Sequence, residues 1–177
     1  MVVNFKSMLI VAGKITAVLR RIMRWLIISF FSYMAIAVLI QVVGRYVFNY
    51  SIDWAAETAT FAQIWMILLA AGLAMRSNLH VSVDALTSIL PVPILRFLII
   101  VIAVPCLWFL WQAIVGSIVL IDIGQIQTSP VLQIPMWIPY LALPIGLIYF
   151  GFELLLSLVV KWKDPKRSVT EIDKLAT

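Results

Sequence analysis

Four long runs without charged side chains constrain the fold of this chain more than any other feature. Residues 25–44, 58–75 and 97–121 contain no Asp, Glu, Lys or Arg, and residues 136–160 contain only Glu153. The hydrocarbon core of a bilayer is roughly 30 Å thick and requires about 20 apolar residues at about 1.5 Å rise per helical residue. The sequence therefore predicts an all-α integral membrane protein with four transmembrane helices.

The composition limits the classes of function that are open to the chain. Its 177 residues are 64% hydrophobic and 12% charged, whereas roughly a quarter of the residues in a soluble domain are charged. Four spans leave room for one membrane domain, residues 25–160, between an N-terminal segment, residues 1–24, and a cytoplasmic tail, residues 161–177. The net charge of +5 lies beside the apolar runs, which indicates contact with lipid headgroups and not with nucleic acid.

The distribution of Lys and Arg predicts the orientation of the chain. Five basic residues precede the first run, Arg45 alone lies in the first loop, Arg76 and Arg96 flank the second loop, the third loop has none, and the tail has five. Cytoplasmic segments of membrane proteins carry an excess of Lys and Arg. We therefore expect both termini on the cytoplasmic side of a bacterial inner membrane.

Two further helices are predicted at the membrane surface. Apolar residues recur at helical spacing in residues 1–24 among basic ones, which is typical of a basic amphipathic helix lying in the interface. Residues 82–90 have one apolar face and are followed by Pro91 and Pro93, which predicts a short amphipathic helix on the cytoplasmic side. The four spans are expected at about residues 25–48, 53–76, 94–122 and 136–160.

Glu153 is the one carboxylate well inside a predicted span. A charged side chain there is costly, so it is expected to be paired or functional. The structural interpretation is an intramembrane ion pair with Arg96, which begins the third span on the same side. The functional alternative is a self-contained, homodimeric transporter that couples ion or proton movement through Glu153.

Two smaller polar groups lie at the span ends. Asp53 and Glu57 are four residues apart and share a helix face near Arg45, which indicates either a local salt bridge or a patch that meets a partner. On the other side, Arg76, His80 and Asp84 recur every four residues. One His and one Asp do not make a metal site, so we interpret this stripe as a structural network.

The remaining polar residues argue against an enzyme. Cys106 and His80 are each the only residue of their type and lie on different segments, so no nucleophile–base pair is apparent, and no span carries a His to ligate haem. We expect no catalytic residue, cofactor or metal in this chain. Gln41, Gln63 and Gln112 lie within spans, where amides can hydrogen-bond to helices of the chain or of a partner.

Short motifs follow one another along the four runs in an order that resembles a known family. They are Gly44-Arg45-Tyr46-Val47-Phe48, Trp54-Ala55-Ala56-Glu57, Gly72, Ala74, Arg76, His80, Val81, Val83, Asp84, Pro130, Ile134, Pro135, Trp137, Tyr140, Pro144 and Gly146. From about residue 24 to residue 160, the chain resembles the small membrane (Q-type) subunit of tripartite ATP-independent periplasmic (TRAP) transporters. It departs from the family at Ala56, where the first of two adjacent acids is common.

The resemblance implies a division of labour among subunits. A large multi-pass membrane subunit would carry an organic acid and sodium ions by an elevator-like movement, after a periplasmic substrate-binding protein delivers the acid. The small subunit would be a scaffold that binds neither substrate nor sodium itself. Residues expected to contact partners at the periplasmic face are Arg45, Asp53, Trp54, Glu57, Pro130, Pro135 and Tyr140.

Overall fold

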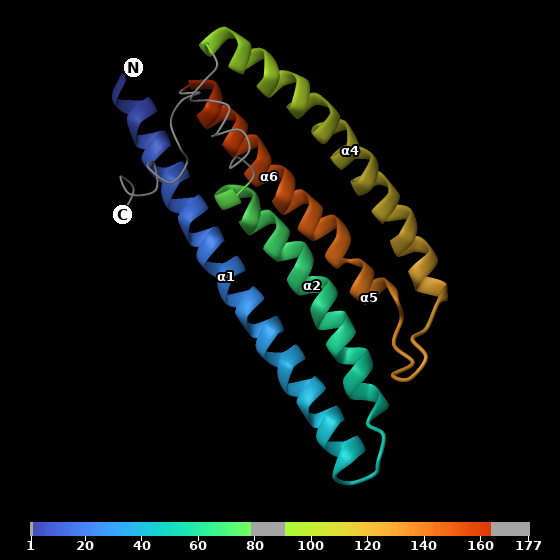
Figure 1. Cartoon of the computed structure of the whole chain (residues 1–177). Helices are drawn as coiled ribbons and strands as arrows, with labels where there is room; N and C mark the ends of the chain where they lie inside the picture. The colour runs from blue at the N-terminus through green and yellow to red at the C-terminus, as the bar shows by residue number, and fades with distance from the viewer. Residues whose placement is uncertain (1, 79–90, 164–177) are drawn as a thin grey trace.

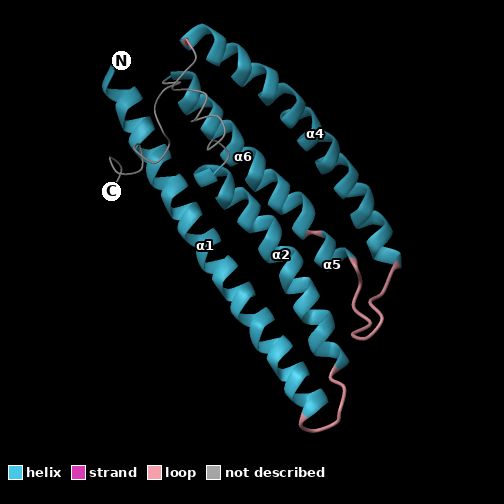
Figure 2. Cartoon of the chain, in the orientation of Figure 1, coloured by secondary structure: helices cyan, strands magenta, loops and turns pink. Residues whose placement is uncertain are grey.

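The computed structural model describes residues 2–78 and 91–163 of the chain, and within them the secondary structure is helical apart from an isolated β-bridge between Thr128 and Pro135. The helices are α1 (Val2–Tyr46), α2 (Asp53–Asn78), α4 (Val92–Ile126), α5 (Trp137–Tyr140) and α6 (Ala142–Lys163). Figure 2 shows the loops between α1 and α2 and between α4 and α5, and the short break at Leu141 between α5 and α6. The all-α fold predicted from the sequence is confirmed.

Four helices are long and apolar enough to cross a membrane. These segments are Thr16–Tyr46, Asp53–Met75, Val92–Ile126 and Trp137–Val159. The last combines α5 and α6, and its prolines sit where a helix tolerates them. Pro139 lies in the single turn of α5, and Pro144 is the third residue of α6, where its missing N–H would have no partner within the helix. The prediction of four transmembrane helices is confirmed.

α1 differs from its expected form because it is one continuous helix. The surface helix predicted at residues 1–24 is not a separate element, since its backbone runs on through Arg24 and Trp25 into the span. The physical reason is the absence of a helix breaker, because residues 14–43 contain neither glycine nor proline. The second predicted surface helix, residues 82–90, lies outside the described residues.

The helices pack in the order α1, α2, α6, α4 (Figure 1). α2 and α6 form the centre. In the 18-residue apolar windows of the spans, 28% of the residues are buried for α2 and 39% for the segment of α5 and α6, whereas only 6% are buried for α1 and 11% for α4. The short helix α5 packs against α4. Most of the large apolar side chains of α1 and α4 are therefore left for lipid or for another protein.

Small residues bring the central helices close together. Ala37 of α1 is buried against Ala55 and Ala59 of α2. Between α2 and α6, a methyl group added to Gly146 would lie 2.6 Å from Cβ of Leu68. Such contacts fix the depth of each helix relative to its neighbours, because a shift along the axis would place a larger side chain at the point of closest approach.

Candidate functional site

The one ion pair in the part of the chain that the structure describes joins α1 to α6. The guanidinium of Arg20 donates from Nε to Oε1 of Glu153 and from Nη2 to Oε2, both at 2.8 Å. Glu153 is only 2% exposed, and the hydroxyl of Tyr149 donates to the same carboxylate at 3.4 Å. The carboxylate is therefore held by a two-pronged, charge-assisted contact inside the protein.

The predicted partner of Glu153 was wrong. Arg96 instead places its guanidinium 5.8 Å from the centre of the Trp162 ring. Trp162 follows Glu153 by nine residues in α6, which is about 13 Å along a helix axis and beyond the reach of an Arg side chain. The sequence interpretation missed Arg20 because it assigned that residue to a separate surface helix. The unbroken helical pattern across residues 14–43 was the signal that could have found it.

The depth of this pair also differs from the expected one. Leu68 of α2 packs against Gly146 of α6, and Gly72 packs against Tyr149 one turn further on. The two helices therefore run parallel to each other. Continued by one more turn, this pairing places the backbone of Arg76 at about the level of Glu153. Arg76 follows Asp53 by 23 residues, about 35 Å along α2. Since the hydrocarbon core is roughly 30 Å thick, the ion pair lies near one edge of the bilayer and not at its middle.

At the opposite end of the helices, Glu57 fastens the loop between α4 and α5. Its Oε2 accepts the backbone N–H of Leu132 at 2.8 Å. The same loop is closed by Ser129, which is fully buried, and by Ile134: the N–H of Ser129 donates to the Ile134 carbonyl at 2.8 Å, and the Ile134 N–H donates to the Ser129 hydroxyl at 3.3 Å. Glu57 thus helps to hold the conformation of a loop that belongs to the predicted partner-binding surface.

The other residues predicted at this end lie on the same side of the chain but do not form one cluster. Asp53 accepts a hydrogen bond from the hydroxyl of Ser51 at the start of α2. Arg45 is exposed and, among the residues the structure describes, forms no ion pair with Asp53 or Glu57, which argues against the local salt bridge. Trp54 and Pro130 are exposed, whereas Pro135 and Tyr140 are half-buried. Their partner contacts stay predictions.

The predicted network on the other side falls largely outside the described residues. His80 and Asp84 lie outside the described residues, and only the backbone of Arg76, in α2, is described. In residues 2–78 and 91–163, no group of three or more His, Cys, Asp or Glu side chains is arranged to hold a metal ion. The stripe of Arg76, His80 and Asp84 stays a prediction.

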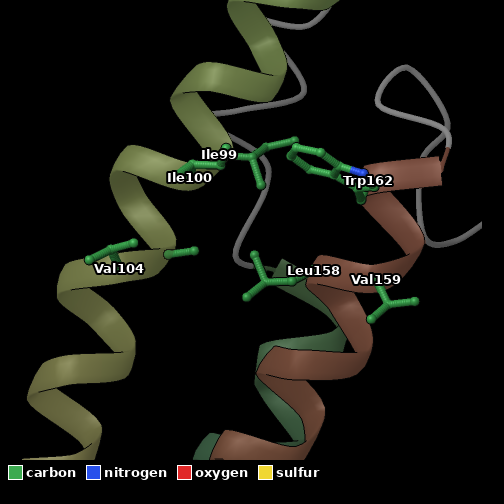
Figure 3. Close-up of a pocket in the computed structure, with 7 residues that line it drawn as sticks. Ile99, Ile100, Val104, Leu158, Val159 and Trp162 are labelled. Atoms are coloured by element: carbon green, nitrogen blue, oxygen red, sulfur yellow. The ribbon is translucent and has the colours of Figure 1, made fainter.

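An apolar groove of about 380 Å³ lies between α4 and α6 (Figure 3). Its lining residues are Ile99, Ile100, Ala103, Val104, Leu158, Val159 and Trp162. A second cavity of about 300 Å³ at the Gly44 end of α1 is lined by Leu39, Ile40, Val43, Gly44, Phe48 and Ile52. Neither lining set includes a charged side chain, so neither cavity is built to bind an organic acid anion.

Comparisons with known proteins agree with the resemblance. A sequence model of the family described as "Tripartite ATP-independent periplasmic transporters, DctQ component" matches residues 34–164. The chain is 28% identical over 155 residues to the C4-dicarboxylate TRAP transporter small permease protein DctQ of Vibrio cholerae, covering 74% of this chain and 67% of the relative. It is 31% identical over 137 residues to a putative TRAP transporter small permease protein of Haemophilus influenzae, covering 76% and 83%.

A third relative is much longer than this chain. The isethionate TRAP transporter permease protein DctMQ of Oleidesulfovibrio alaskensis is 33% identical over 109 residues, which cover 59% of this chain and 17% of the relative. The relatives are transporter subunits and not enzymes. Because the family model matches well over half of the residues, including most of the four spans, the chain belongs to the DctQ component family of TRAP transporters.

Proposed function

We propose that this chain is the scaffold subunit of a TRAP transporter in a bacterial inner membrane, and that a larger permease subunit beside it carries the substrate. The observation that supports a scaffold is that residues 2–78 and 91–163 contain neither an unpaired buried carboxylate nor, in the two cavities described above, a charged lining. Their one buried carboxylate, Glu153, is neutralised by Arg20, and the two cavities described above are apolar. Substrate and sodium sites therefore belong in the partner.

The relatives indicate the class of substrate and the kind of partner. Those from Vibrio cholerae and Oleidesulfovibrio alaskensis are named for C4-dicarboxylates and for isethionate, and both are organic acid anions. The match to the Oleidesulfovibrio alaskensis relative occupies 17% of its length, so there a sequence like this one is joined to a larger permease in a single polypeptide. We infer that the same two parts assemble here as separate or joined units, with sodium-coupled, elevator-like movement in the larger part.

The outer face is where a periplasmic substrate-binding protein would dock. Glu57 and the loop that it holds lie at the end of the spans where the basic residues are fewest, which is the periplasmic end by the distribution of Lys and Arg. Both termini are then cytoplasmic. Arg45, Trp54 and Pro130 are exposed at this end and are proposed to contribute to the contact.

The experiment that tests the scaffold function is affinity purification of the tagged chain from its native membranes in a mild detergent, followed by mass spectrometry. A large multi-pass permease in roughly equal amount is the expected result. Recovery of the chain alone, as a defined dimer in several detergents, would contradict the proposal.

The self-contained transporter coupled through Glu153 has less support, because its carboxylate already has a full partner in Arg20 and lies near a membrane edge. Liposomes that contain only this chain distinguish the two functions. We expect no uptake of a C4-dicarboxylate or of isethionate with a sodium or proton gradient. Uptake that is lost in Glu153→Gln would favour the self-contained transporter.

A further inference from the structure

Gln63 is a polar side chain in the middle of a span without a partner in the described part of the chain. It lies ten residues after Asp53 and 13 before Arg76, about 15 Å and 20 Å along α2. Its side chain is exposed, and its amide makes no hydrogen bond with the residues that the structure describes. Hydrocarbon cannot satisfy an amide, so an unpaired Gln at this depth is unfavourable in lipid.

The side chains around Gln63 are suited to contact with another helix. Thr60, Gln63, Ile67 and Ala71 follow one another at intervals of three, four and four residues, so they share one face of α2, and all four are exposed. We call them the Gln63 face. Ile67 is the only large apolar side chain among the four, and small or polar side chains are typical of helix interfaces inside membranes.

The remaining sides of α2 are already in use. Ala59 is buried toward α1, and Leu68 and Gly72 meet α6. The exposed side chains of α4 differ in kind, because Trp108, Phe109 and Trp111 are 64–70% exposed and are large enough to fill space against lipid. The Gln63 face thus has no packing partner within the described chain. It also lacks the large apolar side chains that suit a helix surface to contact with lipid.

We propose that the Gln63 face seats a transmembrane helix of the large permease subunit, and that this helix offers a hydrogen-bonding group to the Gln63 amide. The inference rests on the proposed function, which supplies the partner. A permease helix is favoured over a second copy of this chain because the Oleidesulfovibrio alaskensis relative carries a similar sequence within a longer permease chain. Lipid is disfavoured because its tails offer no hydrogen bond.

The first test compares Gln63→Leu with Gln125→Leu. Gln125 is the control because it is exposed and has no hydrogen bond among the described residues, but it lies in the last turn of α4. At that end of the span its amide can reach water or lipid headgroups and needs no protein partner. Quantitative mass spectrometry would measure the permease that co-purifies with the tagged chain. We expect Gln63→Leu to weaken the association roughly threefold to tenfold, the value of one interhelical hydrogen bond, and Gln125→Leu to match the wild type. Wild-type recovery with Gln63→Leu, or equal loss in both, would overturn the proposal.

The second test measures proximity by photo-cross-linking and does not require a substitution that weakens the complex. In a Cys106→Ser background, a benzophenone maleimide is attached at Ile67→Cys or at Ile118→Cys, because Ile67 and Ile118 are 51% and 54% exposed in their spans. Illumination in native membranes should cross-link the Ile67 position to the large permease in higher yield than the Ile118 position. Cross-links only to lipid or to a second copy, or equal yields from both positions, would overturn the assignment of this face.

The two proposals fail in different ways. If the wild-type chain brings down no larger permease, the scaffold function itself is wrong. If the wild type retains the permease but the Ile67 position does not reach it, only the assignment of the Gln63 face is wrong.

Discussion

Arg20 and Glu153, which are 133 residues apart, connect the first described helix to the last through two parallel hydrogen bonds of 2.8 Å. α1 and α6 each pack mainly on α2, and the ion pair joins α1 directly to α6. Two parallel bonds fix direction as well as distance. The pair therefore sets the depth of α1 against α6 near one edge of the bilayer.

Removing Arg20 should destabilise the protein more than removing Glu153. The side chain of Glu153 is 1% exposed and that of Arg20 is 19% exposed. Arg20→Met leaves a buried carboxylate without its partner, which costs about 3–5 kcal/mol, whereas Glu153→Gln leaves an Arg that can extend toward the headgroups. Unfolding of the purified variants in mixed detergent micelles would measure the difference.

Arg21→Met is the control for that comparison, because Arg21 is exposed on the same turn of α1. The double variant Arg20→Met with Glu153→Leu should recover most of the stability, since it removes both charges at once. Equal losses for Arg20→Met and Glu153→Gln would show that Arg20 contributes no more than the packing of its side chain.

Three glycines should respond to alanine in a graded order. A methyl group at Gly146 meets Cβ of Leu68 at 2.6 Å, with the backbone carbonyl carbon and Cα of Leu68 at 3.2 and 3.3 Å, so the two helices must separate. At Gly151 it meets only the terminal methyl of Leu110, which can move, and at Gly116 it meets nothing within 4 Å. Thermal unfolding should rank Gly146→Ala least stable and Gly151→Ala intermediate. Gly116→Ala should gain up to about 1 kcal/mol from helix propensity. A stable Gly146→Ala variant would contradict the close α2–α6 packing.

The four spans were predictable because their length and lack of charge are properties of each segment alone. A run of about 20 apolar residues without a charge has few alternatives to a membrane helix, and the residues around Asp53 and Val92 mark helix starts that the structure confirms. The helix ends follow from turn residues and prolines close to them in sequence. Local sequence information was sufficient for this level of the fold.

The partner of Glu153 was not predictable in the same way, because it depends on how three helices are placed relative to one another. Arg96 and Glu153 both adjoin the same predicted membrane side, and sequence position alone cannot reveal that Arg96 lies beside Trp162, about 13 Å along α6 from Glu153. That offset follows from contacts such as Leu110 with Gly151, which fix α4 against α6. The role of Glu57 was hidden for the same reason, since Leu132 is 75 residues away.

Glu57→Ala should loosen the outer loop without disturbing the spans. The change removes the acceptor of the Leu132 N–H, and a hydrogen bond to a charged group contributes about 1.5–3 kcal/mol. Hydrogen exchange followed by mass spectrometry should show faster exchange in residues 127–136 and unchanged exchange in α6. Glu57→Gln, which keeps an acceptor oxygen, is the matched control and should show a smaller increase. Unchanged exchange in Glu57→Ala would contradict the role of Glu57 in holding the loop.

The orientation of the chain can be checked at the loop between α1 and α2. Tyr50 is 68% exposed there, and Arg45 is the only basic residue nearby, whereas five Lys or Arg residues lie in residues 161–177. The excess of basic residues on the cytoplasmic side predicts that Tyr50→Cys, in a Cys106→Ser background, reacts with a membrane-impermeant maleimide applied from the periplasm. Thr177→Cys should react only after the inner membrane is permeabilised. The reverse pattern would place Glu57 and its loop in the cytoplasm, where a periplasmic binding protein cannot reach them.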